Sequence, residues 1–170
     1  YTLVACADYV LSKTPGNTVS NMSSTRALRD VTEKYGQTYE ASAVGEVNVV
    51  ELMKKNNAVI GGEGNGGIIY PELHYGRDAL VGVALFLSHL AEKGISSRAL
   101  RDQYPSYYMS KKKIQLTPQI DVDAVLNEVI SRYSEEELTT IDGVKIDFEL
   151  GWVHLRKSNT EPIIRIYTEA

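Results

Sequence analysis

The sequence contains few of the residues that would place it in a specialised class of protein. It has one cysteine, Cys6, among 170 residues, so an internal disulfide is impossible and a reducing, cytoplasmic compartment is predicted. Cys6 lies among apolar residues and is expected to be a buried structural thiol. The sequence has no apolar run of about 18 residues. Its start also lacks the charged segment of a signal peptide, so no membrane association is expected.

Positively charged residues are also fewer than negatively charged ones. The chain has 18 Lys and Arg against 22 Asp and Glu, a net charge of −4, and its pI is near 5.4. No overall positive field exists to attract nucleic acid, so an anion would need a local site. The 3 histidines and the cysteine form no zinc-binding pattern. His89 and His154 fall in a predicted helix and strand, where structural roles are expected.

Helical and strand patterns alternate over the first 94 residues. This alternation favours an α/β fold with three α/β/α layers and a mixed, mostly parallel sheet. The longest predicted helix, 77–94, ends at Gly94 and has one apolar stripe, typical of a face packed on a core. The stripe consists of Leu80, Val83, Ala84, Leu87, Leu90 and Ala91. The predicted helices are 3–11, 23–36, 47–57, 77–94 and 96–104, and the predicted strands are 18–22, 38–44, 58–62 and 68–70.

A second pattern follows residue 112. Residues 107–118 read as an extended connector with three consecutive lysines, so domains are predicted at 1–112 and 113–170. The second domain is expected to be a small α+β unit with an antiparallel sheet. Its predicted elements are a helix at 121–134 and strands at 144–149, 151–157 and 163–169. Because the chain starts without methionine and stops in an apolar strand, we expect a fragment whose second domain is truncated.

The segment "GGEGNGG", residues 61–67, follows an apolar strand. Ligand sites in open α/β sheets lie beyond the carboxyl ends of the strands. Glu63 can accept hydrogen bonds and Asn65 can both donate and accept, which suits sugar hydroxyls, while glycines would let a sugar approach the backbone. The lysine and hydroxyl of a P-loop are absent. Taken alone, a turn between two strands explains the segment equally well.

The segment "RKSNTEP", residues 156–162, lies between two predicted strands. Arg156 offers a planar fork for a phosphate, and Ser158, Asn159 and Thr160 offer further hydrogen-bonding groups. A hairpin turn whose polar side chains bond their own backbone is the alternative.

Three segments together resemble a known family. "GEGNGG", "HYGRDALVG" and "GWVHLRKSNTEP" closely resemble the third and fourth domains of the α-D-phosphohexomutases. This family includes phosphoglucomutase, phosphomannomutase and phosphoglucosamine mutase. Many members carry G-E-x-S-G-H in the third-domain loop, where the glutamate and serine bind the hexose. The resemblance therefore implies sugar binding by Glu63, and also by Asn65 and Gly67, which stand where the family has the serine and the histidine.

The fourth-domain loop of the family grips the phosphate that is not transferred. The resemblance assigns this role to Arg156, Ser158, Asn159 and Thr160. The family's phosphorylated serine and Mg²⁺-binding loop belong to its first two domains, so no catalytic and no metal-binding residue is expected in this chain. The resemblance implies Mg²⁺ and a glucose 1,6-bisphosphate-type activator for a full-length protein.

The implied reaction interconverts hexose 1-phosphate and hexose 6-phosphate through a phosphoserine enzyme and a bisphosphorylated sugar. The implied partners are a hexose phosphate and the N-terminal domains of the same polypeptide, without which the chain is expected to be inactive. "AVGEVNV", residues 43–49, resembles the phosphoglucosamine branch, but glucose, mannose and glucosamine phosphates all stay open. The alternatives are a non-enzymatic sugar-phosphate or nucleotide-binding module and a purely structural domain pair.

Four further residues leave two interpretations open. Arg77 and Asp78 could shape a cleft wall with His74, or form an ion pair at a helix start. Glu46 could belong to a site or be a solvated residue at a helix N-terminus.

Overall fold

A computed structural model describes residues 1–117, 120–158 and 161–170, which form two compact units, Tyr1–Tyr107 and Tyr108–Ala170. No helix in these ranges is long and apolar enough to cross a membrane. The elements of unit 1 are α1 (Thr2–Lys13), β1 (Thr18–Asn21), α2 (Ala27–Lys34), β2 (Tyr39–Ser42), α3 (Glu46–Lys55), β3 (Ile60–Glu63), β4 (Gly67–Tyr70), β5 (His74–Arg77), α4 (Ala79–Lys93) and α5 (Ser97–Arg101).

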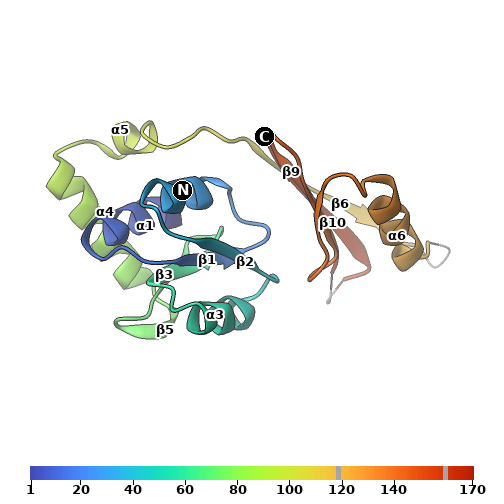
Figure 1. Cartoon of the computed structure of the whole chain (residues 1–170), viewed down its shortest axis with the longest axis horizontal. Helices are drawn as coiled ribbons and strands as arrows, with labels where there is room; N and C mark the ends of the chain where they lie inside the picture. The colour runs from blue at the N-terminus through green and yellow to red at the C-terminus, as the bar shows by residue number, and fades with distance from the viewer. Residues whose placement is uncertain (118–119, 159–160) are drawn as a thin grey trace. The chain divides into compact units, whose positions relative to one another are not determined.

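Unit 1 is the predicted three-layer α/β/α fold with a mixed sheet. The strand order is β2-β1-β3-β4-β5, in which β1 is parallel to β2 and β3, and the β3–β4 and β4–β5 pairs are antiparallel. Consecutive residues of β4 point to opposite faces: Ile68 packs with α1 and α2, and Ile69 packs with α3. Helix α3 therefore covers the face of the sheet opposite to α1 (Figure 1).

Of the stripe predicted to be the buried face of α4, Leu90 packs against the core, but the prediction is wrong for the other positions. Leu80, Val83 and Leu87 of the predicted stripe are 83%, 55% and 56% exposed. The helix instead turns Gly82 and His89 inward, and Gly82 lies so close to the sheet that a side chain there would come within 2.8 Å of Ile68 Cγ1. The close approach that Gly82 permits sets which face of α4 meets the sheet.

A buried polar network joins α1, α2 and α4. The Asp8 carboxylate accepts hydrogen bonds from the hydroxyls of Tyr35 at 2.8 Å and Tyr104 at 2.9 Å, and its Oδ2 lies 3.1 Å from His89 Nε2. Asp8 and His89 are 5% and 4% exposed. His89 is therefore a structural histidine, as its place in the helix predicted.

Acidification is expected to weaken unit 1. Burial lowers the pKa of His89 below its usual 6.5. Burial opposes ionisation of Asp8, but the hydrogen bonds from Tyr35 and Tyr104 prevail and hold its pKa below the usual 3.8. The unfolded chain thus binds each proton before the folded chain does, so stability is complete above pH 6.5 and is lost as the pH falls.

Hydrogen exchange of the β1 amides in urea, at about pH 7.5, 5.5 and 4, measures this loss. His89→Gln should reduce the change in the free energy of opening just below pH 6.5, where the histidine of the unfolded chain takes up its proton. A free energy of opening that does not change with pH would contradict the prediction.

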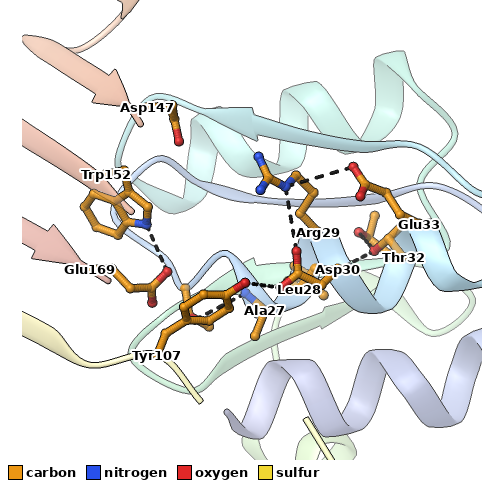
Figure 2. A network of polar contacts seen from close by, with 12 residues as sticks. Ala27, Leu28, Arg29, Asp30, Thr32, Glu33, Tyr107, Asp147, Trp152 and Glu169 are labelled. Atoms are coloured by element: carbon orange, nitrogen blue, oxygen red, sulfur yellow. Dashed lines mark hydrogen bonds and ion pairs between the residues drawn. The ribbon is translucent and has the colours of Figure 1, made fainter. Parts of the chain in front are cut away.

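Unit 2 is the predicted α+β domain with an antiparallel sheet. The strand order is β6-β10-β9-β8-β7, and every pair in it is antiparallel. In the register of β9 with β10, Trp152 lies opposite Glu169, and the indole N–H donates to this buried carboxylate at 2.9 Å (Figure 2). The elements are β6 (Met109–Gln115), α6 (Val122–Arg132), β7 (Glu137–Thr139), β8 (Val144–Asp147), β9 (Trp152–Lys157) and β10 (Ile163–Glu169).

The predicted connector 107–118 contains strand β6, and the boundary predicted after residue 112 falls inside it. The division between the units lies at Tyr107 and Tyr108 instead. The sequence did not predict β6 because its exposed lysines replace the apolar alternation of a strand. It is an edge strand, and edge strands commonly carry exposed lysines. Tyr107 belongs to unit 1, where its hydroxyl donates to Asp30 Oδ2 at 2.7 Å (Figure 2).

Candidate functional site

The glycine segment forms a tight hairpin between β3 and β4. Glu63 pairs with Gly67 across the two strands, and the Gly66 N–H donates to the Glu63 carbonyl at 3.2 Å. Asn65 Oδ1 accepts from the Gly67 N–H at 3.0 Å, which closes the turn. The segment is thus a strand connection as well as a candidate site, and Asn65 stands at its tip.

Protein atoms occupy the space beside four of the five glycines, Gly61, Gly62, Gly64 and Gly67. A side chain on Gly62 would collide with the Gly67 carbonyl oxygen, and one on Gly67 would come within 2.7 Å of Arg77 Cδ. In contrast, no atom of the described residues lies within 4 Å of the Cβ position of Gly66. The space beside Gly62 and Gly67 therefore serves the hairpin and the stem of Arg77, which gives both glycines a structural role, and the approach of a sugar to this loop stays a prediction.

Glu63 is a buried carboxylate with two fixed neighbours. It is 7% exposed, its Oε1 accepts from Asn21 Nδ2 at 2.8 Å, and its Oε2 lies 3.6 Å from Arg77 Nη1. Asn21 is itself held by the Ser23 N–H and the Ser24 hydroxyl, which donate to its Oδ1 at 3.1 and 2.9 Å. The orientation of the Glu63 carboxylate is therefore set before any ligand arrives.

An open hollow of about 600 Å³ lies beside the hairpin. Two of the predicted sugar-binding residues, Asn65 and Gly67, line it, whereas Glu63 lies behind its wall. The residues lining the hollow are Glu46, Asn65, Gly66, Gly67, Arg77, Asp78 and Ala79.

Arg77 pairs with Glu46 and not with its neighbour Asp78. Its Nε donates to Glu46 Oε2 at 2.7 Å and its backbone N–H donates to Glu46 Oε1 at 3.1 Å. These hydrogen bonds lower the pKa of Glu46, and the one from the Arg77 backbone N–H has the larger effect. Asp78 caps α4 through the Val81 N–H at 3.0 Å, and its Oδ2 lies 3.1 Å from His74 Nε2.

The predicted phosphate loop joins β9 and β10 in unit 2. Arg156 is 14% exposed at its side chain, and its Nε lies 3.2 Å from Asp142 Oδ2, in ion-pair rather than hydrogen-bond geometry. The Ser158 N–H donates to the Ile163 carbonyl at 3.0 Å and closes the loop. Asn159 and Thr160 lie outside the described residues.

His154 holds the segment that faces Arg156 through a hydrogen bond to Asp142. It is 1% exposed, and its Nε2–H donates to the Asp142 carbonyl at 2.7 Å, while burial lowers its pKa. The neutral ring thus fixes the backbone of Asp142, whose carboxylate faces Arg156. This is the structural role that the sequence predicted for His154.

The sequence interpretation missed Asn21 and left Glu46 and Arg77 undecided. Asn21 ends β1, which is parallel to β3, and the carboxyl ends of neighbouring parallel strands lie together. That rule could have placed Asn21 beside Glu63. In contrast, no local pattern relates Arg77 to Glu46, which is 31 residues away.

The described residues contain no group of three or more His, Cys, Asp or Glu side chains that could hold a metal ion. The described residues therefore do not fit the magnesium that the resemblance implies for a full-length protein. The chemistry that the two loops offer is hydrogen bonding and ion pairing with a polar, anionic ligand.

Two family models match the chain in succession. Residues 1–108 match "Phosphoglucomutase/phosphomannomutase, alpha/beta/alpha domain III". Residues 110–170 match "Phosphoglucomutase/phosphomannomutase, C-terminal domain". The two matches meet where the two units meet.

Individual relatives agree with these models. The phosphoglucosamine/phosphogalactosamine mutase of Sulfurisphaera tokodaii is 38% identical, over 89% of the chain and 34% of the relative. The phosphoglucomutase/phosphomannomutase of Thermococcus kodakarensis is 35% identical, over 99% of the chain and 37% of the relative. A solved phosphoglucomutase/phosphomannomutase family protein from Burkholderia thailandensis has a TM-score of 0.83 at 26% identity, over 99% of the chain and 36% of that protein. The chain thus spans about a third of the length of these relatives.

Proposed function

The chain belongs to the phosphoglucomutase/phosphomannomutase family, since it matches domain III and the C-terminal domain in order. We propose that it is the sugar- and phosphate-binding part of a phosphohexomutase. That enzyme would interconvert hexose 1-phosphate and hexose 6-phosphate through a phosphoserine and a bisphosphorylated sugar. The chain would supply the sugar-hydroxyl and distal-phosphate contacts. The serine, the magnesium site and the chemical steps would belong to the other domains of the polypeptide. The match of both domains in order is the observation that carries this proposal.

Unit 1 offers the groups that a sugar requires. The hollow falls within the roughly 300–1,000 Å³ of small-ligand sites. Its wall presents an amide at Asn65, a guanidinium at Arg77 and a carboxylate at Glu46. A hydroxyl both donates and accepts, so such a mixed wall can bind a hexose in either of two orientations. We assign the hexose to this hollow, with Asn65 in direct contact.

The charge of the hollow favours an amino sugar. Glu46 and Asp78 line it and Glu63 lies behind it, whereas Arg77 is the lining residue that carries a positive charge. A net negative wall attracts the ammonium of glucosamine more than the neutral hydroxyl of glucose or mannose. We therefore place glucosamine phosphate first among the substrates, ahead of glucose and mannose phosphates. The mutase names of the relatives cover all three choices.

Two groups in unit 2 support a role in phosphate binding. Asp142 fixes the guanidinium of Arg156, and the closed turn places Ser158 at the start of the loop. A planar guanidinium can grip phosphate oxygens in pairs, which an ammonium cannot do. We propose that Arg156, Ser158, Asn159 and Thr160 hold the phosphate that is not transferred.

Titration of the 170-residue chain with glucosamine 6-phosphate, glucose 1-phosphate and ATP tests the proposal. We expect hexose phosphates to bind and Arg156→Lys to weaken binding about 10-fold or more, because a charge-assisted hydrogen bond contributes about 1.5–3 kcal/mol. Arg132→Lys is the matched control, since that arginine lies exposed on α6 and pairs with Glu128.

Three outcomes would overturn parts of the proposal. Equal binding by the Arg156→Lys and Arg132→Lys variants would remove the phosphate role of Arg156. Binding that depends on adenine would favour a nucleotide-binding module. Turnover by the 170-residue chain alone would refute the assignment of the chemical steps to other domains.

A further inference from the structure

Arg77 stands between two carboxylates at the back of the hollow. Glu46, at the start of α3, accepts from its Nε at 2.7 Å and from its backbone N–H at 3.1 Å. Glu63, at the end of β3, lies on the other side with its Oε2 at 3.6 Å from Arg77 Nη1. The three residues come from α3, β3 and β5, so the tertiary fold assembles them.

The position of the guanidinium is fixed on one side and open on the other. Arg77 donates two hydrogen bonds, from Nε and from its backbone N–H, to the Glu46 carboxylate, and its side-chain stem lies against Gly67, where a Cβ would be 2.7 Å from Cδ. The side chain is nevertheless 48% exposed and lines the hollow. A fixed cation with an exposed surface is ready to receive a ligand at little entropic cost.

The contact between Arg77 and Glu63 is too long for a hydrogen bond. At 3.6 Å the two atoms attract each other as charges, and each keeps hydrogen-bonding capacity toward a third group. A hydroxyl placed about 2.8 Å from both could accept from the guanidinium and donate to the carboxylate at once. Glu63 is otherwise enclosed, so such a hydroxyl would reach it beside Arg77.

We propose that Arg77 is a positioning and ligand-contacting residue of the hollow, which together with Glu63 receives one sugar hydroxyl, and that Glu46 anchors it. This inference rests on the proposed function, since it names the groups that meet the sugar in that same hollow. It also gives Gly67 a purpose, because a side chain there would displace the Arg77 stem.

The test uses amide NMR spectra of the 170-residue chain, in which the signals of Asn65, Gly66 and Gly67 report binding in the hollow. The ligands are glucosamine 6-phosphate, glucose 6-phosphate and the 2-, 3- and 4-deoxy analogues of glucose 6-phosphate. The variants are Arg77→Gln, Arg77→Lys and Glu46→Gln. Arg98→Lys is the control, because its exposed ion pair with Asp102 on α5 lies outside the hollow.

We expect Arg77→Gln to weaken binding of the full sugars about 10-fold, the effect of about one charge-assisted hydrogen bond, with Arg77→Lys and Glu46→Gln between it and the unsubstituted chain. For one deoxy analogue the Arg77→Gln loss should vanish, since the bridging hydroxyl is already missing. A merely structural arginine would instead weaken all analogues equally.

The outcomes separate the two proposals. If the unsubstituted chain binds hexose phosphates and Arg77→Gln binds every analogue as well as Arg98→Lys does, the inference is wrong and the proposed function stands. An equal loss for all analogues also refutes the bridging hydroxyl. If the unsubstituted chain binds none of the sugars, both proposals are wrong. If Arg77→Gln fails to fold, Arg77→Lys, which keeps the charge, takes its place in the same comparison with Arg98→Lys.

Discussion

Asp8→Ala is expected to destabilise unit 1 by about 3–5 kcal/mol, the usual cost of removing one partner from a buried charged network. The substitution would leave the hydroxyls of Tyr35 and Tyr104 and the ring of His89 without their shared acceptor. Each buried donor without an acceptor costs about 1–3 kcal/mol. Since domains are stable by only about 5–15 kcal/mol, much of the stability of unit 1 would be lost.

Hydrogen exchange of the β1 and β3 amides measures this effect within unit 1. Asp102→Ala is the matched control, because Asp102 is 61% exposed at its side chain and pairs with Arg98 on the surface, where such pairs contribute about 0–1 kcal/mol. The two variants should therefore differ by at least about 2 kcal/mol. A loss below about 1 kcal/mol for Asp8→Ala would show that the network relaxes around the missing carboxylate.

Gly143→Ala is expected to destabilise unit 2 by about 2–4 kcal/mol and to displace Arg156. Gly143 has φ +74° in the turn before β8, a conformation that costs other residues about 1–2 kcal/mol. A Cβ there would also collide with the Leu155 carbonyl and come within 2.8 Å of Arg156 Cα. Both are backbone atoms of β9, so the collision cannot be relieved by a side-chain rotation.

Fluorescence of Trp152, the chain's single tryptophan, follows the unfolding of unit 2. Gly94→Ala is the control for backbone conformation, because Gly94 has φ +64° and, among the residues that the structure describes, none has an atom within 4 Å of its Cβ position. Its cost should stay near about 1–2 kcal/mol and fall on unit 1. If Gly143→Ala leaves the unfolding transition of Trp152 unchanged, as Gly94→Ala should, Gly143 does not hold β9 in place.

Much of the fold could be predicted from local patterns. Alternating helix and strand signals gave the three layers of unit 1, and the strands 144–149, 151–157 and 163–169 match β8, β9 and β10 within a few residues. Strands β5, β6 and β7 were missed. They are short or exposed, as the burial of His74–Arg77 and Met109–Gln115 shows, so their sequences lack the apolar alternation on which strand prediction depends.

The sequence by itself predicted the two-domain order and the strands next to segments 61–67 and 156–162, and it carried the resemblance of these segments to one family. Such features follow from neighbours in the chain, since periodicity and turn residues act over a few positions. Only the tertiary structure decided which face of α4 is buried, that Glu63 lies behind the wall of the hollow, and that Arg77 meets Glu46. These depend on the shape of surfaces from distant segments, such as Gly82 against Ile68, which no local pattern encodes.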